Sequence, residues 1–153
     1  ELINQFTDEL THRVRLNRPG IKTARNIYAL PLLKPFSEEW YAQSFSSFLN
    51  HYDYVAIEAM PFMEEAADPK QWMTQLAKAV AKHPEGLKKT IFELQAVDWK
   101  KKSNIPSSIF IDQIALLKKH GALNLGYYPD NVYEDQPKLA DVQKYFALPV
   151  ELY

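Results

Sequence analysis

Apolar and polar residues alternate in four short stretches of the chain, and longer stretches with helical periodicity separate them. The alternation is typical of strands and covers residues 23–30, 54–60, 90–95 and 122–128. Apolar residues spaced four apart predict a first helix over residues 2–17. Four further helices are predicted over residues 38–52, 68–81, 109–120 and 138–146. The predicted order is therefore α-β-α-β-α-β-α-β-α.

Capping residues support these helix boundaries. Short polar side chains accept hydrogen bonds from free N–H groups at helix starts, and glycine adopts the left-handed conformation that ends many helices. The predicted N-caps are Ser37, Asp68 (followed by Pro69) and Ser107 or Ser108, and the predicted C-cap is Gly121.

The strict alternation of strand and helix predicts a parallel sheet, with strand centres 30, 35 and 32 residues apart. A doubly wound open sheet usually carries a glycine-rich phosphate turn after its first strand, but residues 29–33 here read ALPLL. We therefore predict the C-terminal half of a (β/α) TIM-like barrel, built from four parallel βα units. The N-terminal half of the barrel is missing from this chain, so the preceding part of the protein would supply it.

Composition agrees with one globular α/β domain and excludes several functions. The chain has 153 residues, of which 46% are hydrophobic and 24% charged. Its net charge of −1 gives no electrostatic basis for binding nucleic acid. Cysteine is absent, which excludes disulfides and thiolate chemistry. The four histidines show no spacing typical of metal ligands, so no metal site and no cofactor are predicted in this domain.

The candidate site lies where the predicted strands end, because the active face of such a barrel is formed by strand C-termini and the loops after them. The residues at these positions are Tyr28, Glu58, Met60, Glu93, Gln95, Asp98, Trp99, Tyr127, Tyr128 and Asp130. Alternation places Glu58 on the face opposite Ile57, and it places Glu93 and Gln95 on the face opposite Phe92. Helices cover the outer face with apolar contacts, so the polar set is predicted to face the barrel interior.

Two acids near loop aromatics are typical of carbohydrate sites. Sugar hydroxyls bind carboxylates and amides, and the C–H faces of sugar rings pack on aromatic side chains. Glycosidases also use paired carboxyl groups about 5–9.5 Å apart. The alternatives remain open: a basic neighbour could neutralise either glutamate, and the GYYPD turn at residues 126–130 could serve only structure. Trp40 and Trp72, on predicted helices, are assigned to packing.

Three long motifs resemble one known family. These are YDYVAIEAMPFME at residues 52–64, TIFELQAVDWKKK at residues 90–102 and GALNLGYYPDNVYEDQP at residues 121–137. Together they are similar to the C-terminal, glycoside-hydrolase-like barrel domain of the PgaB (HmsF) family of poly-β-1,6-N-acetylglucosamine N-deacetylases from biofilm-forming Gram-negative bacteria. The likeness runs over essentially the whole chain.

The resemblance implies that the domain binds partly de-N-acetylated poly-N-acetylglucosamine, and that some relatives hydrolyse it. The family's metal belongs to a deacetylase domain that is absent here, and its proposed catalytic aspartate lies upstream of Glu1. The implied location is the periplasm, in association with the outer membrane through a lipoprotein anchor. The implied partners are the polymer and an outer-membrane export porin. A non-catalytic docking module for that porin is the alternative function.

Overall fold

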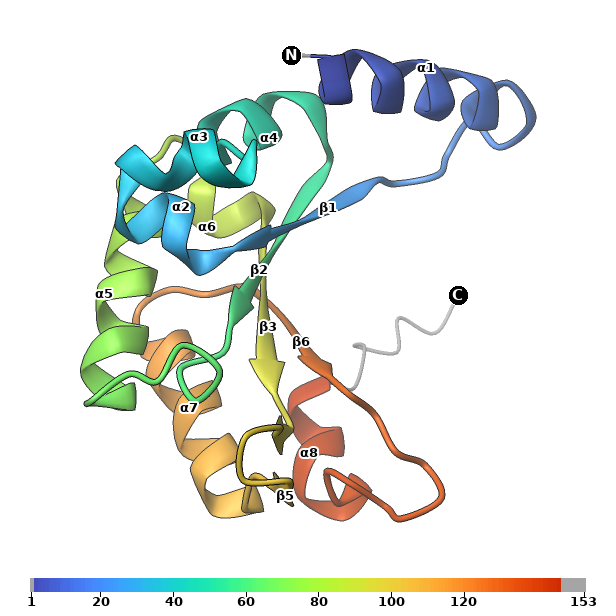
Figure 1. The fold of residues 1–153 in the computed structure, drawn as a ribbon. Helices are drawn as coiled ribbons and strands as arrows, with labels where there is room; N and C mark the ends of the chain where they lie inside the picture. Colours follow the sequence, from blue (N-terminus) through green and yellow to red (C-terminus); the bar gives the residue numbers. More distant parts are fainter. Residues whose placement is uncertain (1, 147–153) are drawn as a thin grey trace.

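Four parallel strands form one sheet in the order β1-β2-β3-β6, which is also their order along the chain (Figure 1). The computed structural model describes residues 2–146. The sheet strands are β1 Ala24–Tyr28, β2 Tyr54–Ala59, β3 Thr90–Gln95 and β6 Asn124–Tyr128. Because every crossover steps to the next neighbour, the described sheet has no reversal of the kind that defines a doubly wound sheet. The stepwise order is that of a (β/α) barrel.

The helices and one small ribbon complete the fold. The helices are α1 Leu2–Asn17, α2 Ala29–Leu33, the 3₁₀ turn η1 Pro35–Ser37, α3 Glu38–Tyr41, α4 Phe45–His51, α5 Pro69–Ala81, α6 Gly86–Lys89, α7 Ser107–Lys119 and α8 Leu139–Phe146. The ribbon pairs β4 Val97–Asp98 with β5 Ser103–Asn104. None of the helices within residues 2–146 has the length and hydropathy needed to cross a membrane.

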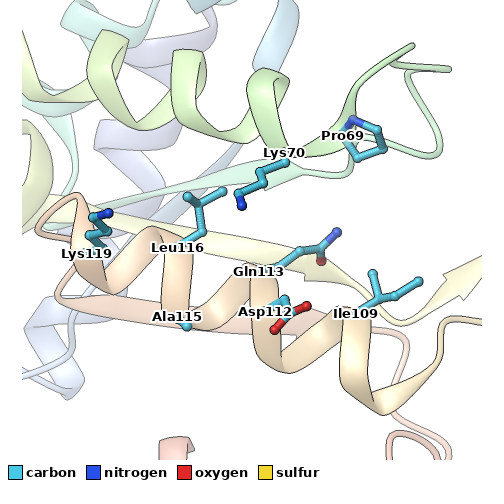
Figure 2. A pocket seen from close by; sticks show the side chains of 8 residues that line it. All are labelled: Pro69, Lys70, Ile109, Asp112, Gln113, Ala115, Leu116 and Lys119. Carbon is cyan, nitrogen blue, oxygen red and sulfur yellow. The ribbon is translucent and has the colours of Figure 1, made fainter.

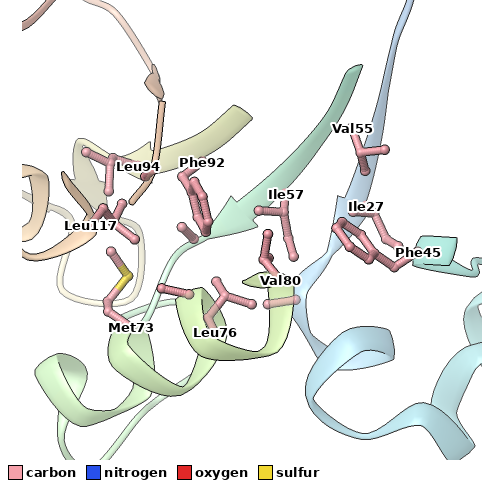
Figure 3. Close-up of a cluster of buried hydrophobic side chains, with 14 of the residues drawn as sticks. Ile27, Phe45, Val55, Ile57, Met73, Leu76, Val80, Phe92, Leu94 and Leu117 are labelled. Carbon is pink, nitrogen blue, oxygen red and sulfur yellow. The ribbon is translucent and has the colours of Figure 1, made fainter. Parts of the chain in front are cut away.

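One face of the sheet is buried against helices, as the alternation predicted. Ile57 on β2 and Phe92 on β3 are fully buried among side chains of α5 and α7, including Leu76 and Leu117 (Figure 3). Helices α2, α5 and α7 lie along this side of the sheet, while residues 2–146 place no helix layer on the other side (Figure 1). The asymmetry leaves the second face free to carry polar side chains.

Two of the predicted caps are confirmed. The Asp68 carboxylate accepts a hydrogen bond of 2.9 Å from the Gln71 N–H at the start of α5. Gly121 has a φ of 89° after α7. The backbone N–H groups of Gly121 and Ala122 donate to the carbonyls of Lys118 and Leu117, which is the Schellman arrangement.

The other cap predictions are wrong. Ser37 precedes α3 without a side-chain capping bond, and its buried hydroxyl has no partner within residues 2–146. Helix α7 begins directly after Pro106, so neither Ser107 nor Ser108 serves as a cap. A side-chain cap that was not predicted lies at the start of α8, where the Leu139 N–H donates a hydrogen bond of 2.8 Å to the Asp135 carboxylate.

Two predicted elements are divided. Residues 38–52 form α3 and α4 instead of one helix, because Ala42 between them has a φ of 51°. The first strand ends at Tyr28, and the chain turns directly into α2. Pro31 is compatible with α2 because N–H groups in the first turn of a helix have no intrahelical acceptor.

The apolar stripe of the predicted first helix, α1, is exposed. Leu2, Phe6 and Leu10 are largely accessible, and Asn4 is the buried residue of this helix. Polar residues connect α1 to the domain: the Asn4 amide donates to Ser47 at 2.8 Å, and the Arg15 guanidinium pairs with Asp53 at 2.8 Å. β1 is an edge strand of the described sheet, so no neighbouring strand lies beneath the stripe.

The two faces of β3 differ in their packing, and truncation measures this difference. Replacing Phe92 by alanine leaves a cavity in the fully buried core and is expected to lower the free energy of unfolding by about 3–5 kcal/mol. Ile91→Ala is the control, because Ile91 is only partly buried on the opposite face. Urea denaturation should show that Ile91→Ala lowers the free energy of unfolding by less than half as much as Phe92→Ala does. Equal decreases in the two variants would contradict this packing.

Candidate functional site

The open face of the sheet holds a groove at the C-terminal ends of the strands. It has a volume of about 370 Å³. Its lining residues come from β1, β2, β3, β6 and the two loops after β2 and β3: Asn26, Tyr28, Glu58, Met60, Met63, Glu93, Trp99 and Tyr128. A second hollow of about 350 Å³ shares Asn26, Tyr28 and Glu58 and continues along β1 toward Gln43. The groove is therefore elongated across the edge of the sheet.

A pair of glutamates forms the floor of the groove. Glu58 on β2 and Glu93 on β3 are direct cross-strand neighbours. Adjacent strands lie about 4.8 Å apart, so the two side chains leave the same face side by side. Neither carboxylate forms an ion pair within residues 2–146. Glu93 accepts a hydrogen bond of 3.4 Å from the Asn26 side-chain amide, which is a neutral donor.

The environment favours the protonated form of both acids. Burial raises the pKa of Glu93 above its ordinary value. Burial also raises the pKa of Glu58, and the negative charges of Glu93 and then Glu64 raise it further. Two uncompensated carboxyl groups at one site share protons or attract a cation. The groove therefore holds two acids whose pKa values are raised and which have no basic partner within residues 2–146.

Aromatic rings stand on both sides of this acidic floor. Trp99, in the loop after β3, lies 6.2 Å from the ring of Tyr128 at the end of β6. On the opposite side, Tyr28 at the end of β1 lies 5.1 Å from the ring of Tyr41. Trp99 is 39% exposed, so a flat apolar surface remains accessible beside the glutamates. This arrangement matches a ligand with both apolar faces and polar edges.

Gln95 shares the face of Glu93 but has no polar atom free for a ligand in this structure. Its side chain is 0% exposed. Its carbonyl oxygen accepts from the Met63 N–H at 3.0 Å, and its amide nitrogen donates to the Val97 carbonyl at 2.7 Å. Gln95 thereby connects the loop after β2 to the ribbon that carries Trp99, which gives it a positioning role in the groove.

The Asp98 carboxylate, like the Gln95 amide, forms bonds within the protein. Its carboxylate accepts from the N–H groups of Lys100 and Lys101 at 3.1 and 3.0 Å and pairs with the Lys101 ammonium. The hydrogen bond from the Lys101 backbone is the main reason that the pKa of Asp98 is lowered. The acid closes the turn of the β4–β5 ribbon beside Trp99, and it does not line the groove.

Tyr127 and Asp130 lie apart from the groove as well. The Tyr127 ring packs on the helix side of the sheet against Phe110 and Phe146, with centroid distances of 5.7 and 5.0 Å. Its hydroxyl donates to Asp130 at 3.4 Å. Burial raises the pKa of Tyr127, and Asp130 raises it further. The alternation of β6 places Tyr127 on the helix-covered face and Gly126 and Tyr128 on the open face.

Sequence reasoning missed several residues of the site. Asn26 lines the groove, and it was detectable because it precedes Tyr28 by two positions on the same strand. Gln43, whose side chain accepts from the Tyr28 N–H at 3.1 Å, lies in a loop and gave no signal. Trp40 was assigned to packing, but it is 75% exposed and its ring contacts only the edge of the Phe36 ring among the aromatic residues of the described part of the chain. Trp72 was also assigned to packing, and this is confirmed because it packs against the hydrophobic core.

Within residues 2–146, no group of three or more His, Asp or Glu side chains is placed to hold a metal ion. The chemistry available at the groove is that of carboxyl groups, one amide and aromatic rings. The absence of a cofactor stays a prediction.

Comparison with known proteins identifies the relatives. Two curated proteins from Escherichia coli, of strains K12 and O157:H7, are each 42% identical over a match of 151 residues; the match covers 95% of this chain and 22% of theirs. Both are named poly-beta-1,6-N-acetyl-D-glucosamine N-deacetylase. The chain therefore spans about a fifth of the length of these relatives. The resemblance to the PgaB family is confirmed.

A solved structure supports the same assignment. The glycoside hydrolase domain of PgaB (BpsB) from Bordetella bronchiseptica superimposes with a TM-score of 0.88 at 45% identity, covering 93% of this chain and 40% of that one. The match agrees with a partial barrel, as the strand order indicated. The family model described as hypothetical glycosyl hydrolase family 13 matches residues 1–128. The chain belongs to this glycosyl hydrolase family.

Proposed function

We propose that the groove binds partly de-N-acetylated poly-β-1,6-N-acetylglucosamine. The observation that carries the proposal is the Glu58–Glu93 pair, which lies between two aromatic walls and has no basic partner within residues 2–146. The names of the curated relatives supply the identity of the polymer. A de-N-acetylated sugar carries an ammonium group, and two uncompensated carboxyl groups attract such a cation.

The shape of the groove suits a chain of sugars. Trp99 and Tyr128 offer one apolar surface for the C–H face of a ring, and Tyr28 offers another across the glutamates. The second hollow continues from Tyr28 along β1, so adjacent rings of a polymer have room on both sides of the acidic floor. The Asn26 amide adds a donor and an acceptor for a hydroxyl or acetamido group.

Hydrolysis of the same polymer is the second candidate. It is favoured by the paired carboxyl groups on neighbouring strands, since glycosidases combine one protonated acid with one carboxylate. Size analysis of the polymer after incubation with the protein separates the two functions. If the polymer keeps its length, the protein only binds it. If the native protein shortens the polymer and neither the Glu58→Gln variant nor the Glu93→Gln variant does, the pair carries out the cleavage.

Location in the periplasm with outer-membrane association, and contact with an export porin, are proposed from the family resemblance alone.

Trp99 is predicted to be the main stacking surface of the groove. Replacing it with alanine should weaken binding of a short, partly de-N-acetylated oligomer by about 1–3 kcal/mol, as for an anchoring aromatic residue. Isothermal titration calorimetry measures this change. Trp40→Ala is the control, because Trp40 is exposed but does not line the groove. Unchanged affinity in Trp99→Ala would remove this residue from the binding site.

Glu93 is predicted to select the charged sugar. Glu93→Gln keeps the shape of the side chain and removes its charge, so affinity for an oligomer containing glucosamine should fall about ten-fold. Affinity for the fully N-acetylated oligomer should stay within about two-fold, because that oligomer brings no ammonium group. Glu65→Gln is the matched control, since Glu65 is an exposed acid already paired with Lys100. An equal loss for both oligomers would refute charge selection.

The raised pKa values of Glu58 and Glu93 predict a particular dependence of stability on pH. The native state binds more protons than the unfolded chain between the ordinary value of 4.5 and the raised values, so the pair's contribution to stability falls as pH rises through that window. Glu58→Gln should therefore raise the thermal unfolding midpoint by a few degrees at pH 7 and leave it unchanged at pH 4.

Glu85→Gln is the control for this measurement. Its bond to Lys88 lowers the pKa of Glu85, so neutralising this exposed acid should give no increase at pH 7. If Glu58→Gln has a lower midpoint than the native protein at pH 7, the carboxylate has a stabilising partner and the groove is not an uncompensated acidic site.

A further inference from the structure

Gly126 lies in the row of the open face that carries the glutamate pair. The register of the sheet places four residues side by side across the strands: Tyr28, Glu58, Glu93 and Gly126. Gly126 is therefore the neighbour of Glu93 on β6, and no side chain projects from the sheet at that point. Tyr128 follows on the same face of β6, about 6–7 Å further along the strand. Because Glu93 and Tyr128 both line the groove, Gly126 lies at its floor between them.

Neither the backbone nor the packing of residues 2–146 requires a glycine at this position. The φ of Gly126 is not positive, so an L side chain is compatible with it. A Cβ atom added here would have one neighbour within 4 Å outside the adjoining residues, the Cγ2 of Ile91 at 3.4 Å, which is an ordinary van der Waals distance. Glycine inside a strand lowers stability relative to alanine, because it loses more conformational freedom on folding. The open space above Gly126 therefore has no explanation in the packing of the domain.

The surroundings of this space indicate what it holds. Glycine inside a strand often marks a place where a ligand comes close to the backbone. The Glu93 carboxyl group borders the space across the sheet, and the Tyr128 ring, 6.2 Å from the Trp99 ring, borders it along the strand. A sugar ring with an ammonium group has polar groups at its edge and C–H groups on its faces, so it matches both borders.

On the basis of the function proposed above, we propose that Gly126 carries no side chain so that a glucosamine ring of the polymer lies against the β6 backbone. The ring places its ammonium group at Glu93 and a C–H face on the Trp99–Tyr128 surface. Gly126 thereby sets the depth of the ring in the groove. A charge-assisted hydrogen bond has a length of about 2.7–2.9 Å, so a ring lifted by the length of one carbon–carbon bond, about 1.5 Å, loses it.

Gly126→Ala tests this role by isothermal titration calorimetry with an oligomer that contains glucosamine. Binding should weaken about ten-fold, and Gly126→Val should weaken it further, because each added methyl group lifts the ring away from Glu93. Gly20→Ala makes the same change after α1, outside the groove, where a Cβ atom has no described neighbour within 4 Å. Ala115→Leu adds volume to a separate hollow of about 460 Å³ between α5 and α7 (Figure 2). Both controls should bind as the native protein does.

The stability of the protein without ligand separates a ligand site from a packing requirement. Gly126→Ala should unfold at the same temperature as the native protein or a few degrees higher, since alanine restricts the unfolded chain and has room in the folded one. Higher stability together with weaker binding is the combination that a purely structural glycine would not produce. A lower unfolding temperature means that another part of the protein occupies the space, and it overturns the proposal.

A double variant tests whether Gly126 and Trp99 act on the same sugar ring. The decreases in affinity caused by Gly126→Ala and Trp99→Ala should be less than additive in free energy when combined, because a ring displaced by the methyl group also leaves the Trp99 surface. Additive decreases mean two separate rings and overturn the proposal. Equal binding by the native protein and Gly126→Ala overturns it while leaving the function of the groove intact. A native protein that binds no oligomer containing glucosamine overturns both.

Discussion

The in-register parallel pairing of β2 with β3 determines the character of the open face. It makes Glu58 and Glu93 direct neighbours, and the two acids cannot separate without breaking the sheet. The same register puts Ile57 beside Phe92 on the covered face, where both are fully buried. Core packing therefore fixes the register, and the register holds two like charges together. The acidic floor of the groove is a consequence of the hydrophobic core behind it.

Several polar residues near the groove serve to position its walls. Buried Gln95 joins the loop of Met63 to the ribbon of Trp99, and Asp98 closes the turn of that ribbon. The Ala96 N–H donates to the Tyr128 carbonyl at 2.9 Å, which connects β3 to β6 just beyond the sheet. Trp99 and Tyr128 thus belong to one connected unit. A stacking surface held in this way loses little conformational entropy when a sugar binds.

Alternation within strands was sufficient to predict which residues share the open face, because the period of a strand is fixed by its backbone. It correctly separated Glu58 and Glu93 from Ile57 and Phe92. It failed where the backbone leaves regular structure. The left-handed Ala42 redirects the chain, so the apolar face of α4 is buried while Trp40 is exposed. Gln95 was predicted to be a ligand residue because its partner, the Met63 backbone, comes from a loop whose course short-range patterns do not determine. Tyr127 was predicted from its place near the strand end alone, whereas alternation along β6 puts it on the face opposite Tyr128.

The open edges of the sheet bear on the strength of the site. β1 and β6 each have one paired neighbour in the described sheet, and the apolar stripe of α1 is exposed next to β1. Further βα units beside these strands would cover the stripe and enclose the groove, as in a closed barrel. Enclosure would remove water from Glu58 and Glu93 and so strengthen the interaction between a charged carboxylate and an ammonium group bound beside it. The half-barrel thus supplies the charge and the stacking surface of the site, and closure of the barrel would set how strongly they act.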